Sequence, residues 1–310
     1  MKKTGGNFDP QDKHIYFLAS NPGTLKNADD QIQYMLIPLN ELKGTKAQDK
    51  VKMFLDKGTK VFLDSGVYSI AMEHAKKHNL SHNDALKVPL DELEKFSWLY
   101  DFYCNFVALC GDELWGYVEI DLGGKEQKRK TRAKLEGEGL RPIPVYHPLN
   151  DGWEYFDELA SQYDRIAVGN IVYARPSMRL RIMSTIWERK QQYPHLWVHA
   201  LGFHFHELLN AYPVESVDSS SWLAAVRWAR AQERTMLCGL GELPRSLQYK
   251  LGDGESYKKG EKLWAFAMSM HQKNWRNHIK AATEAGLYPS GCMPPRALKC
   301  TTRGELPPKQ

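Results

Sequence analysis

Residues 215–222 have the sequence ESVDSSSW. An apolar, β-prone run from Tyr212 leads into this stretch, and the residues from Trp222 onward show the apolar repeat of an amphipathic helix. Three serines before the helix supply hydroxyls suited to capping its first turn. The pattern predicts that Asp218 stands at the carboxyl end of a strand, where α/β folds carry their chemistry. The alternative interpretation makes Asp218 an ordinary turn or helix-capping residue.

Short β-branched and aromatic runs of this kind recur along the chain, and longer helix-like stretches separate them. The runs are residues 15–19, 34–38, 61–63, 117–122, 143–146, 165–168, 197–201 and 214–217, with 235–240 as a further candidate. Strands that alternate with helices are typical of parallel sheets. At this length the pattern favours a closed (β/α)8 barrel of the TIM type over a doubly wound sheet.

The helix-like stretches divide the chain into two parts. Helices are expected at residues 49–57, 69–78, 90–106, 127–137, 153–163, 176–192, 205–211 and 222–234. Beyond Glu242 a polar loop precedes a helix at 261–285, and a tail rich in proline and glycine follows it. We predict a barrel domain at residues 1–242 and a helical to irregular extension at residues 243–310.

The composition bounds the class of protein. The chain has 310 residues, of which 42 are basic and 37 acidic, and the net charge is +5. This balance permits a polyanionic partner without requiring one. Five scattered cysteines are typical of a reducing compartment, and the chain has no apolar run of about 18 residues. We expect a cytoplasmic protein with no membrane segment, and the sequence leaves open whether it is a monomer or a homodimer.

Carboxylates follow three of the expected strands. Asp64 comes directly after the run 61–63, and Asp121 ends the run 117–122. Together with Asp218 they are expected to share one mouth of the barrel, and strand alternation predicts that Glu119 also points into the interior. Paired carboxylates suit chemistry on a glycosidic bond, in which one attacks the anomeric carbon and another moves the proton. Neither role needs a metal or another cofactor.

Four short motifs carry a resemblance to a known family. They are DSGxY at residues 64–68, AVG at 167–169, HALG at 199–202 and VD at 217–218. In order and approximate spacing they resemble the tRNA-guanine transglycosylase superfamily, and in particular its phage and bacterial branch that inserts 7-deazaguanines into DNA. The similarity covers about residues 15 to 240. It implies a pentosyltransferase of a bacterial host cell that removes guanine from DNA and inserts a free 7-deazaguanine base such as preQ0.

The resemblance also implies roles for single residues. Asp218 would be the nucleophile that holds the sugar, and Asp64 the general acid and base. Asp121 would bind the pyrimidine edge of the base. The remaining expected substrate-binding residues are Tyr68, which would stack on the base, Ser65 of the same motif, and Gly169, Leu201 and Gly202, which would offer main-chain contacts. In the tRNA enzymes two glycines follow the Asp-Ser pair, whereas Val67 stands at the second position here and is expected to narrow the pocket.

A basic cluster follows Asp121. It comprises Lys125, Lys128, Arg129, Lys130 and Arg132. Beside the mouth of the barrel, these residues are expected to bind phosphates on either side of an extracted nucleotide. The alternative is a solvated helix face. In the extension, Trp275 is expected either to stack on unpaired bases or to form a small core.

Other functions stay open. Within the same chemistry, the substrate would be tRNA instead of DNA. A metal-dependent barrel hydrolase is the alternative from another class, because His204 and His206 lie beside a strand end, with His199 and Asp218 near. The zinc-binding cysteine motif of the tRNA enzymes has no match, so no metal is expected, although Cys292, Cys300 and His271 or His278 leave room for an irregular site.

Overall fold

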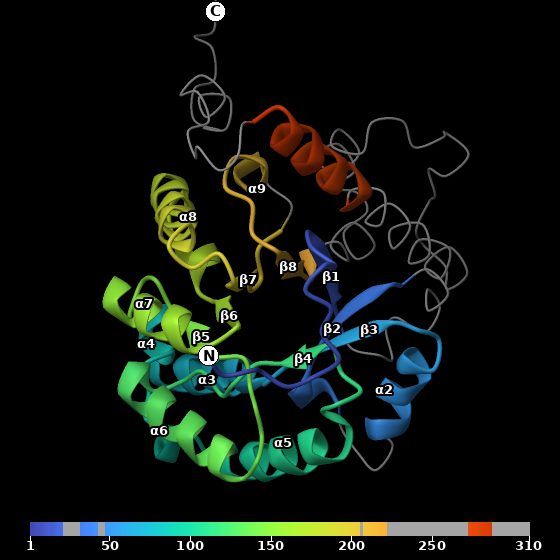
Figure 1. Ribbon diagram of the computed structural model, residues 1–310. Coiled ribbons are helices and arrows are strands. Elements are labelled where there is room, and N and C mark those ends of the chain that lie inside the picture. The colour runs from blue at the N-terminus through green and yellow to red at the C-terminus, as the bar shows by residue number, and fades with distance from the viewer. Residues whose placement is uncertain (21–31, 43–46, 205–206, 222–271, 287–310) are drawn as a thin grey trace, which may run out of the picture.

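The protein is described by a computed structural model that covers residues 1–20, 32–42, 47–204, 207–221 and 272–286. Eight parallel strands form one sheet (Figure 1). They are β1 (Ile15–Ala19), β2 (Tyr34–Pro38), β3 (Lys60–Asp64), β4 (Gly116–Tyr117), β5 (Val145–Tyr146), β6 (Arg165–Val168), β7 (Trp197–Ala200) and β8 (Ser216–Ser219). The strand order is β4-β3-β2-β1-β8-β7-β6-β5, so β1 pairs with β8. This arrangement confirms the predicted TIM-type barrel.

The two edge strands of this sheet also meet. A parallel bridge joins Val118, just after β4, to Ile143, just before β5. Ile143 N donates to Tyr117 O at 2.8 Å, and Glu119 N donates to Ile143 O at 2.9 Å. These bonds close the sheet on itself and satisfy backbone groups that an edge strand would leave unpaired.

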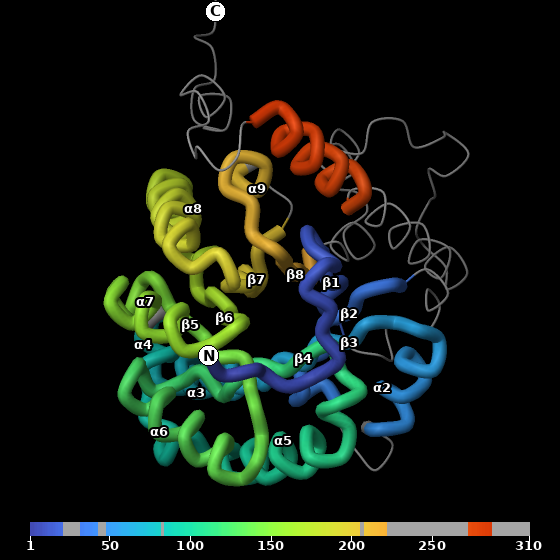
Figure 2. The backbone as a smooth tube through the Cα atoms, in the orientation of Figure 1, coloured from blue at the N-terminus to red at the C-terminus, as the bar shows by residue number. Residues whose placement is uncertain are grey.

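Helices surround the strands (Figures 1 and 2). They are α2 (Ala47–Leu55), α3 (Val67–His78), α4 (His82–Ala85), α5 (Phe96–Cys110), α6 (Gly124–Gly137), α7 (Trp153–Gln162), α8 (Pro176–Lys190) and α9 (Glu207–Ala211), with 3-10 turns η2 (Leu39–Glu41), η3 (Leu90–Glu92) and η4 (Ile171–Tyr173). The single helix expected at 90–106 is divided, because Leu93 has an extended backbone between η3 and α5. The helix expected at 222–234 and the strand expected at 235–240 lie outside the described residues.

The amino end of the barrel is filled by side chains. Arg165 is fully buried there, and its guanidinium donates to Trp115 O at 2.9 Å and to Gly5 O. Phe8 packs edge-on against Trp115 and Trp197, with ring centroids 5.5 and 4.7 Å apart. The N-terminal segment therefore covers this end, and the interior opens toward the carboxyl ends of the strands.

Residues 272–284 form a helix that belongs to the barrel core. Trp275 is 4% exposed and its Nε1 donates to Leu209 O of α9, beside which the helix lies in Figures 1 and 2. Gln272 Oε1 accepts from Tyr16 N of β1 at 2.7 Å, and Arg276 pairs with Asp12. Trp275 is thus a core residue, and the stacking role considered for it is wrong. The rest of the predicted extension lies outside the described residues.

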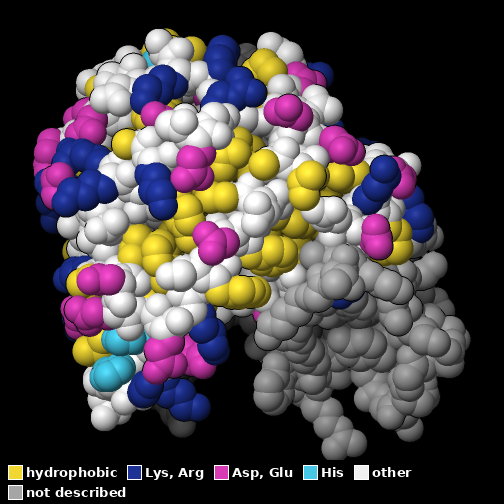
Figure 3. Space-filling model, turned by 90° about the horizontal axis from the view of Figure 1, so that it is seen from below, with side chains coloured by type: hydrophobic (Ala, Val, Ile, Leu, Met, Phe, Trp, Pro, Cys, Tyr) yellow, Lys and Arg dark blue, Asp and Glu magenta, His cyan; other side chains and the backbone are white. Residues whose placement is uncertain are grey.

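The described surface mixes both signs of charge. Figure 3 shows the molecule from below, the side on which α5 and α6 lie in Figure 1, with basic and acidic side chains interspersed around a band of hydrophobic ones. On α5, Trp98 and Leu109 are 49% and 67% exposed. None of the described helices combines the length and the apolar character needed to cross a membrane.

Candidate active site

A cavity of about 420 Å³ opens at the carboxyl ends of the strands. Asp64 at the end of β3, Asp121 after β4 and Asp218 within β8 all line it. The sequence pattern predicted that these three carboxyls, far apart in the chain, would share one mouth, and the structure brings them together. The barrel does this because parallel strands end on the same side of a closed sheet.

Asp64 is the carboxyl that holds its proton. Burial raises the pKa of Asp64 to about 8, and the negative charges of Asp121 and Asp218 add to the effect. Hydrogen bonds from the backbone N–H groups of Gly66 and Ser65 act in the opposite direction, but they offset only part of this rise in the pKa. At neutral pH this side chain is therefore mostly a neutral carboxylic acid, which is the form that a general acid needs.

Asp218 lies in a different environment. Its Oδ1 is 3.1 Å from His199 Nε2 and accepts from Gly202 N at 2.8 Å. No hydrogen bond from a described residue reaches Oδ2. Among the described residues, one oxygen is thus held by the protein, and the other faces no hydrogen-bond donor.

His199 is itself oriented from behind. Its Nδ1 is 2.8 Å from Ser216 Oγ, which accepts from Trp197 Nε1 at 3.0 Å. In the tautomer that donates from Nε2 to Asp218, Nδ1 accepts from the Ser216 hydroxyl. His199 and Ser216 are buried, so the imidazole is fixed in its position beside Asp218.

Asp121 is paired with a histidine as well. Its Oδ2 lies 3.0 Å from His147 Nε2. Burial alone would raise the pKa of Asp121, but the hydrogen bond from His147 and the charges of His147 and Lys128 outweigh burial and lower it. Asp121 therefore stays ionised and acts as a hydrogen-bond acceptor. A Cβ on Gly169 would lie 2.8 Å from the His147 ring, so this glycine makes room for the histidine.

The main chain around the cavity offers mainly acceptors. Gly169 N donates to Tyr146 O, Leu201 N to Val168 O, and Gly202 N to Asp218. These three residues line the cavity as predicted, but their N–H groups are already engaged. No backbone N–H of a described residue donates to their carbonyl oxygens, which are the groups left for the main-chain contacts expected of them.

Two tyrosines stand at the mouth. Tyr68 on α3 and Tyr173 on η4 line the cavity, and each is 38% exposed. Their rings are nearly parallel, with centroids 6.3 Å apart and an angle of 21°, and their hydroxyls are hydrogen-bonded to each other. The predicted stacking residue Tyr68 thus has a partner from another strand end.

Ser65 does not reach the cavity. It is fully buried, and its Oγ accepts from Val67 N in the turn that begins α3. The expectation that it binds substrate is wrong, because the turn directs its side chain into the protein. Val67 is 1% exposed in the core between strands and helices, so it does not narrow the pocket either.

The prediction for α6 needs correction at two residues. Lys128 is fully buried, and its Nζ pairs with Asp151 and donates to Val145 O at 2.9 Å. Arg132 is 4% exposed and pairs with Glu119 at 2.9 Å. Neither side chain is available to a phosphate, because both face the strands.

The ion pair between Arg132 and Glu119 also corrects the prediction for Glu119. The side chain of Glu119 points toward the helix layer and not into the barrel, because the regular strand ends at Tyr117.

The other three residues of the predicted basic cluster lie nearer the surface. Lys125 pairs with Glu154, and Arg129 pairs with Glu126 and Glu158. Lys130 is exposed and makes no ion pair with a described residue. The cluster thus keeps only one uncompensated charge, so it resembles the solvated helix face that the sequence left as an alternative.

Three residues of the site were missed in the sequence. His147 directly follows β5, Asn170 lies between β6 and η4, and Tyr173 ends η4. Asn170 is 6% exposed and lines the cavity, and its Nδ2 has no hydrogen-bond partner among the described residues. The position of His147 one residue after a strand end repeats the pattern of Asp64 and Asp218, and this pattern could have identified it.

A metal site is not assembled from the described residues. Within residues 1–20, 32–42, 47–204, 207–221 and 272–286, no group of three or more His, Cys, Asp or Glu is arranged to hold an ion. His199 is engaged with Ser216 and Asp218, and His204 lies 3.2 Å from the Tyr16 hydroxyl. His206, Cys292, Cys300 and His271 fall outside the described residues.

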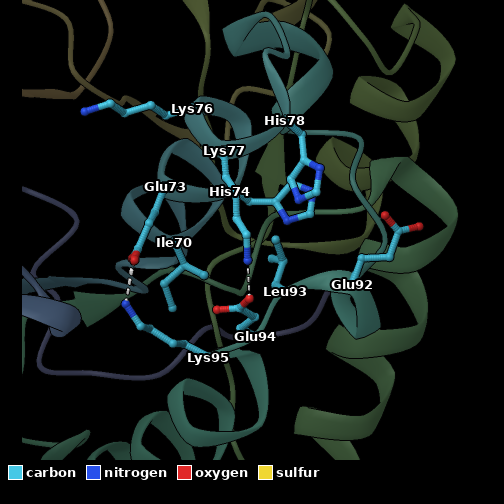
Figure 4. Close-up of a pocket in the computed structure, with 10 residues that line it drawn as sticks. All are labelled: Ile70, Glu73, His74, Lys76, Lys77, His78, Glu92, Leu93, Glu94 and Lys95. Carbon is cyan, nitrogen blue, oxygen red and sulfur yellow. Dashed lines mark hydrogen bonds and ion pairs between the residues drawn. The ribbon is translucent and has the colours of Figure 1, made fainter.

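A second cavity of about 420 Å³ lies between α3 and the η3 region (Figure 4). Four of its charged side chains form two ion pairs, Lys77 with Glu94 at 2.5 Å and Lys95 with Glu73 at 2.7 Å. These pairs are exposed, and none of the predicted site residues lines this cavity. The cavity at the strand ends is therefore the candidate active site.

Comparison with known proteins adds little to this picture. No protein-family model matches the chain, and no curated protein sequence matches it. Among solved structures, the chain is similar to a glycerol uptake operon antiterminator regulatory protein from Listeria monocytogenes. The identity is 16%, the TM-score is 0.39, and the match covers 69% of this chain and 96% of the other. A likeness of this size bears on neither activity nor substrate.

Proposed function

We propose that the protein is a transglycosylase that exchanges guanine in a nucleic acid for a 7-deazaguanine base through a covalent intermediate on Asp218. One observation carries the proposal: a single cavity holds a carboxyl that keeps its proton, Asp64, and a carboxyl with one oxygen held by two donors, Asp218. Such a pair divides the work of glycosidic bond exchange between an acid and a nucleophile.

The first half of the reaction removes guanine. Asp218 Oδ2 attacks C1′ of the nucleotide, and a C1′–O bond forms as the C1′–N9 bond breaks. The electron pair of the broken bond leaves with the base, which takes the proton of Asp64. His199 and Gly202, which donate to Oδ1, hold the carboxylate during the attack.

The second half is the reverse reaction with another base. The incoming 7-deazaguanine gives its N9 proton to the Asp64 carboxylate and attacks C1′, and the bond to Asp218 breaks. Asp64 regains its proton and Asp218 its negative charge, so the enzyme returns to its starting state. Neither half needs a redox cofactor.

The cavity suits a heterocycle with alternating donors and acceptors. Asp121 stays ionised and accepts from N–H groups on the pyrimidine edge, while Asn170 Nδ2 is a buried donor without a partner among the described residues. Such a donor gains a hydrogen bond when a carbonyl oxygen of the base arrives. The volume of about 420 Å³ lies within the range of small-molecule pockets.

The target nucleotide has to leave its stack to reach this cavity. DNA is the proposed substrate, and tRNA is the alternative within the same chemistry. The test incubates the full-length chain with radiolabelled guanine and either guanine-containing duplex DNA or tRNA, then chases with unlabelled preQ0. We expect label to enter DNA and to be displaced by preQ0. Label in tRNA alone would assign the chain to the alternative, and no label in either would refute the proposal.

A further inference from the structure

The start of α8 carries three arginines beside the mouth of the cavity. Arg175 precedes the helix by one residue, and Arg179 and Arg181 follow within its first turns. Val172 and Tyr173, just before Arg175, line the cavity itself. Sequence reasoning placed the nucleic-acid contacts on α6 and overlooked this second group.

Two of these arginines are uncompensated. Arg175 and Arg181 are exposed, and neither forms an ion pair with a described residue. The first turn of α8 contains no acidic residue. Lys125 and Arg129 on α6, in contrast, are paired with glutamates. Among the described residues, Arg175 and Arg181 therefore keep uncompensated charge on α8, in the segment that follows the cavity-lining residues Val172 and Tyr173.

Arg179 differs from Arg175 and Arg181, because its guanidinium is hydrogen-bonded to backbone carbonyls. Its Nε donates to Ala174 O at 2.8 Å and its Nη2 donates to Val172 O. These two carbonyls flank Tyr173, so Arg179 fixes the loop that presents the tyrosine at the mouth. Tyr173 and the exposed Arg175 and Arg181 thus belong to one short segment.

We propose that Arg175 and Arg181 bind the phosphates of the nucleic-acid strand that flank the extracted nucleotide; the identity of this ligand rests on the proposed function. The two positions are about 9 Å apart along the helix axis, a spacing that spans neighbouring nucleotides of an extended strand. Exposed Tyr173, stacked against Tyr68, lines the cavity two residues before Arg175 in the chain and offers its ring to an unstacked base. Guanidinium groups are suited to this contact, since they match phosphate geometry.

The test measures binding of the full-length chain to a fluorescently labelled single-stranded oligodeoxynucleotide at several salt concentrations, with a tRNA probe in parallel. Arg175→Glu and Lys130→Glu make the same change of charge at exposed positions on α8 and α6. We expect Arg175→Glu to weaken binding about tenfold or more at low salt, and Lys130→Glu less than about twofold. Arg175→Ala/Arg181→Ala should lower the slope of log K against log salt by about 1.4.

The outcomes separate this proposal from the proposed function. Arginine dependence with either probe supports the α8 surface, and the probe that binds more tightly identifies the strand. Equal losses for Arg175→Glu and Lys130→Glu, or an unchanged salt slope in the double variant, would overturn it. If the wild type binds through these arginines but exchanges no base, the proposed function fails and the phosphate surface stands.

Discussion

The ends of β3 and β8 deliver the same functional group to one cavity in two different settings. At the end of β3, Asp64 receives backbone N–H groups but no cationic or histidine partner from the part of the chain that the structure describes, and its pKa is raised to about 8. Within β8, Asp218 has one oxygen held by His199 Nε2 and Gly202 N. The residue type is identical, so in the proposed reaction it is the neighbours that assign the acid role to Asp64 and the nucleophile role to Asp218.

This difference shows how one barrel can give chemically identical side chains different protonation and different hydrogen-bond partners. The charges of Asp121 and Asp218 help to keep the proton on Asp64. The acid thus depends on the other two carboxyls remaining ionised nearby, and removal of one group should alter the others. Variants at these two strand ends test the comparison directly.

The largest effect is expected at Asp218. Asp218→Ala removes the attacking oxygen, and we expect base exchange to fall by about 10⁴-fold or more. Mass spectrometry of the denatured protein after incubation with substrate should show no covalent sugar adduct. Ser65→Ala, a change at a buried turn residue outside the cavity, is the control and should retain the adduct. An adduct that persists in Asp218→Ala would remove this residue from the nucleophile role.

Asp64→Asn should have the next largest effect. The amide cannot give a proton to the leaving base, and a loss of about 10²- to 10⁴-fold in base exchange is expected. Because the acid form of Asp64 exists below its pKa of about 8, the wild-type rate should decline as the pH rises through 8. The variant should lack this decline. A wild-type profile that stays flat from pH 7 to 9.5 would contradict the assignment.

The same proton provides a stability readout. The folded protein holds it up to a pH of about 8, whereas the unfolded chain releases it near the ordinary value of 3.8. The unfolded state therefore binds fewer protons between these values, and this group makes stability fall as the pH rises. The melting temperature of the wild type should therefore fall between pH 5 and pH 9. That of Asp64→Asn should fall by fewer degrees over the same range.

A smaller effect on the rate is expected at His199, which contacts Asp218 Oδ1. His199→Gln removes the ring that holds Oδ1 and should slow formation of the covalent adduct about 10- to 100-fold. Nitrogen NMR of labelled histidine should show His199 in the Nε2–H form in the wild type, and Ser216→Ala should disturb that form. A wild-type signal from the Nδ1–H form would contradict the arrangement even if activity were lost.

The smallest effect on rate is expected at Asp121. Asp121→Asn keeps the shape of the side chain but replaces an acceptor with a donor at one atom. We expect the preference for guanine over a base without the matching N–H groups to fall about tenfold or more, with little change in adduct formation. Competition between labelled bases measures this ratio. Selectivity equal to that of the wild type would show that Asp121 does not read the base.

The extent of sequence-based prediction differs between strands and helices. The boundaries of β1, β2 and β6 agree with the predicted runs, because buried parallel strands leave short, dense apolar segments bounded by turn residues. The prediction that Lys128 and Arg132 bind phosphates was wrong because local patterns do not report contacts between distant parts of the chain. Their charges are neutralised by Asp151 and Glu119, which come from other parts of the barrel, and no local pattern reveals such buried pairs.

The amino-acid sequence by itself determined the alternation of strands and helices, the closed parallel barrel, and the placement of Asp64, Asp121 and Asp218 at strand ends, because these follow from local periodicity and turn chemistry. Only the tertiary structure decided that His147 and His199 would each hold one carboxyl, that Asp64 would be left to keep its proton, and that Lys128 and Arg132 of α6 would be buried in ion pairs. Protonation and pairing depend on burial and on neighbours distant in the chain, and these exist only after the barrel has closed.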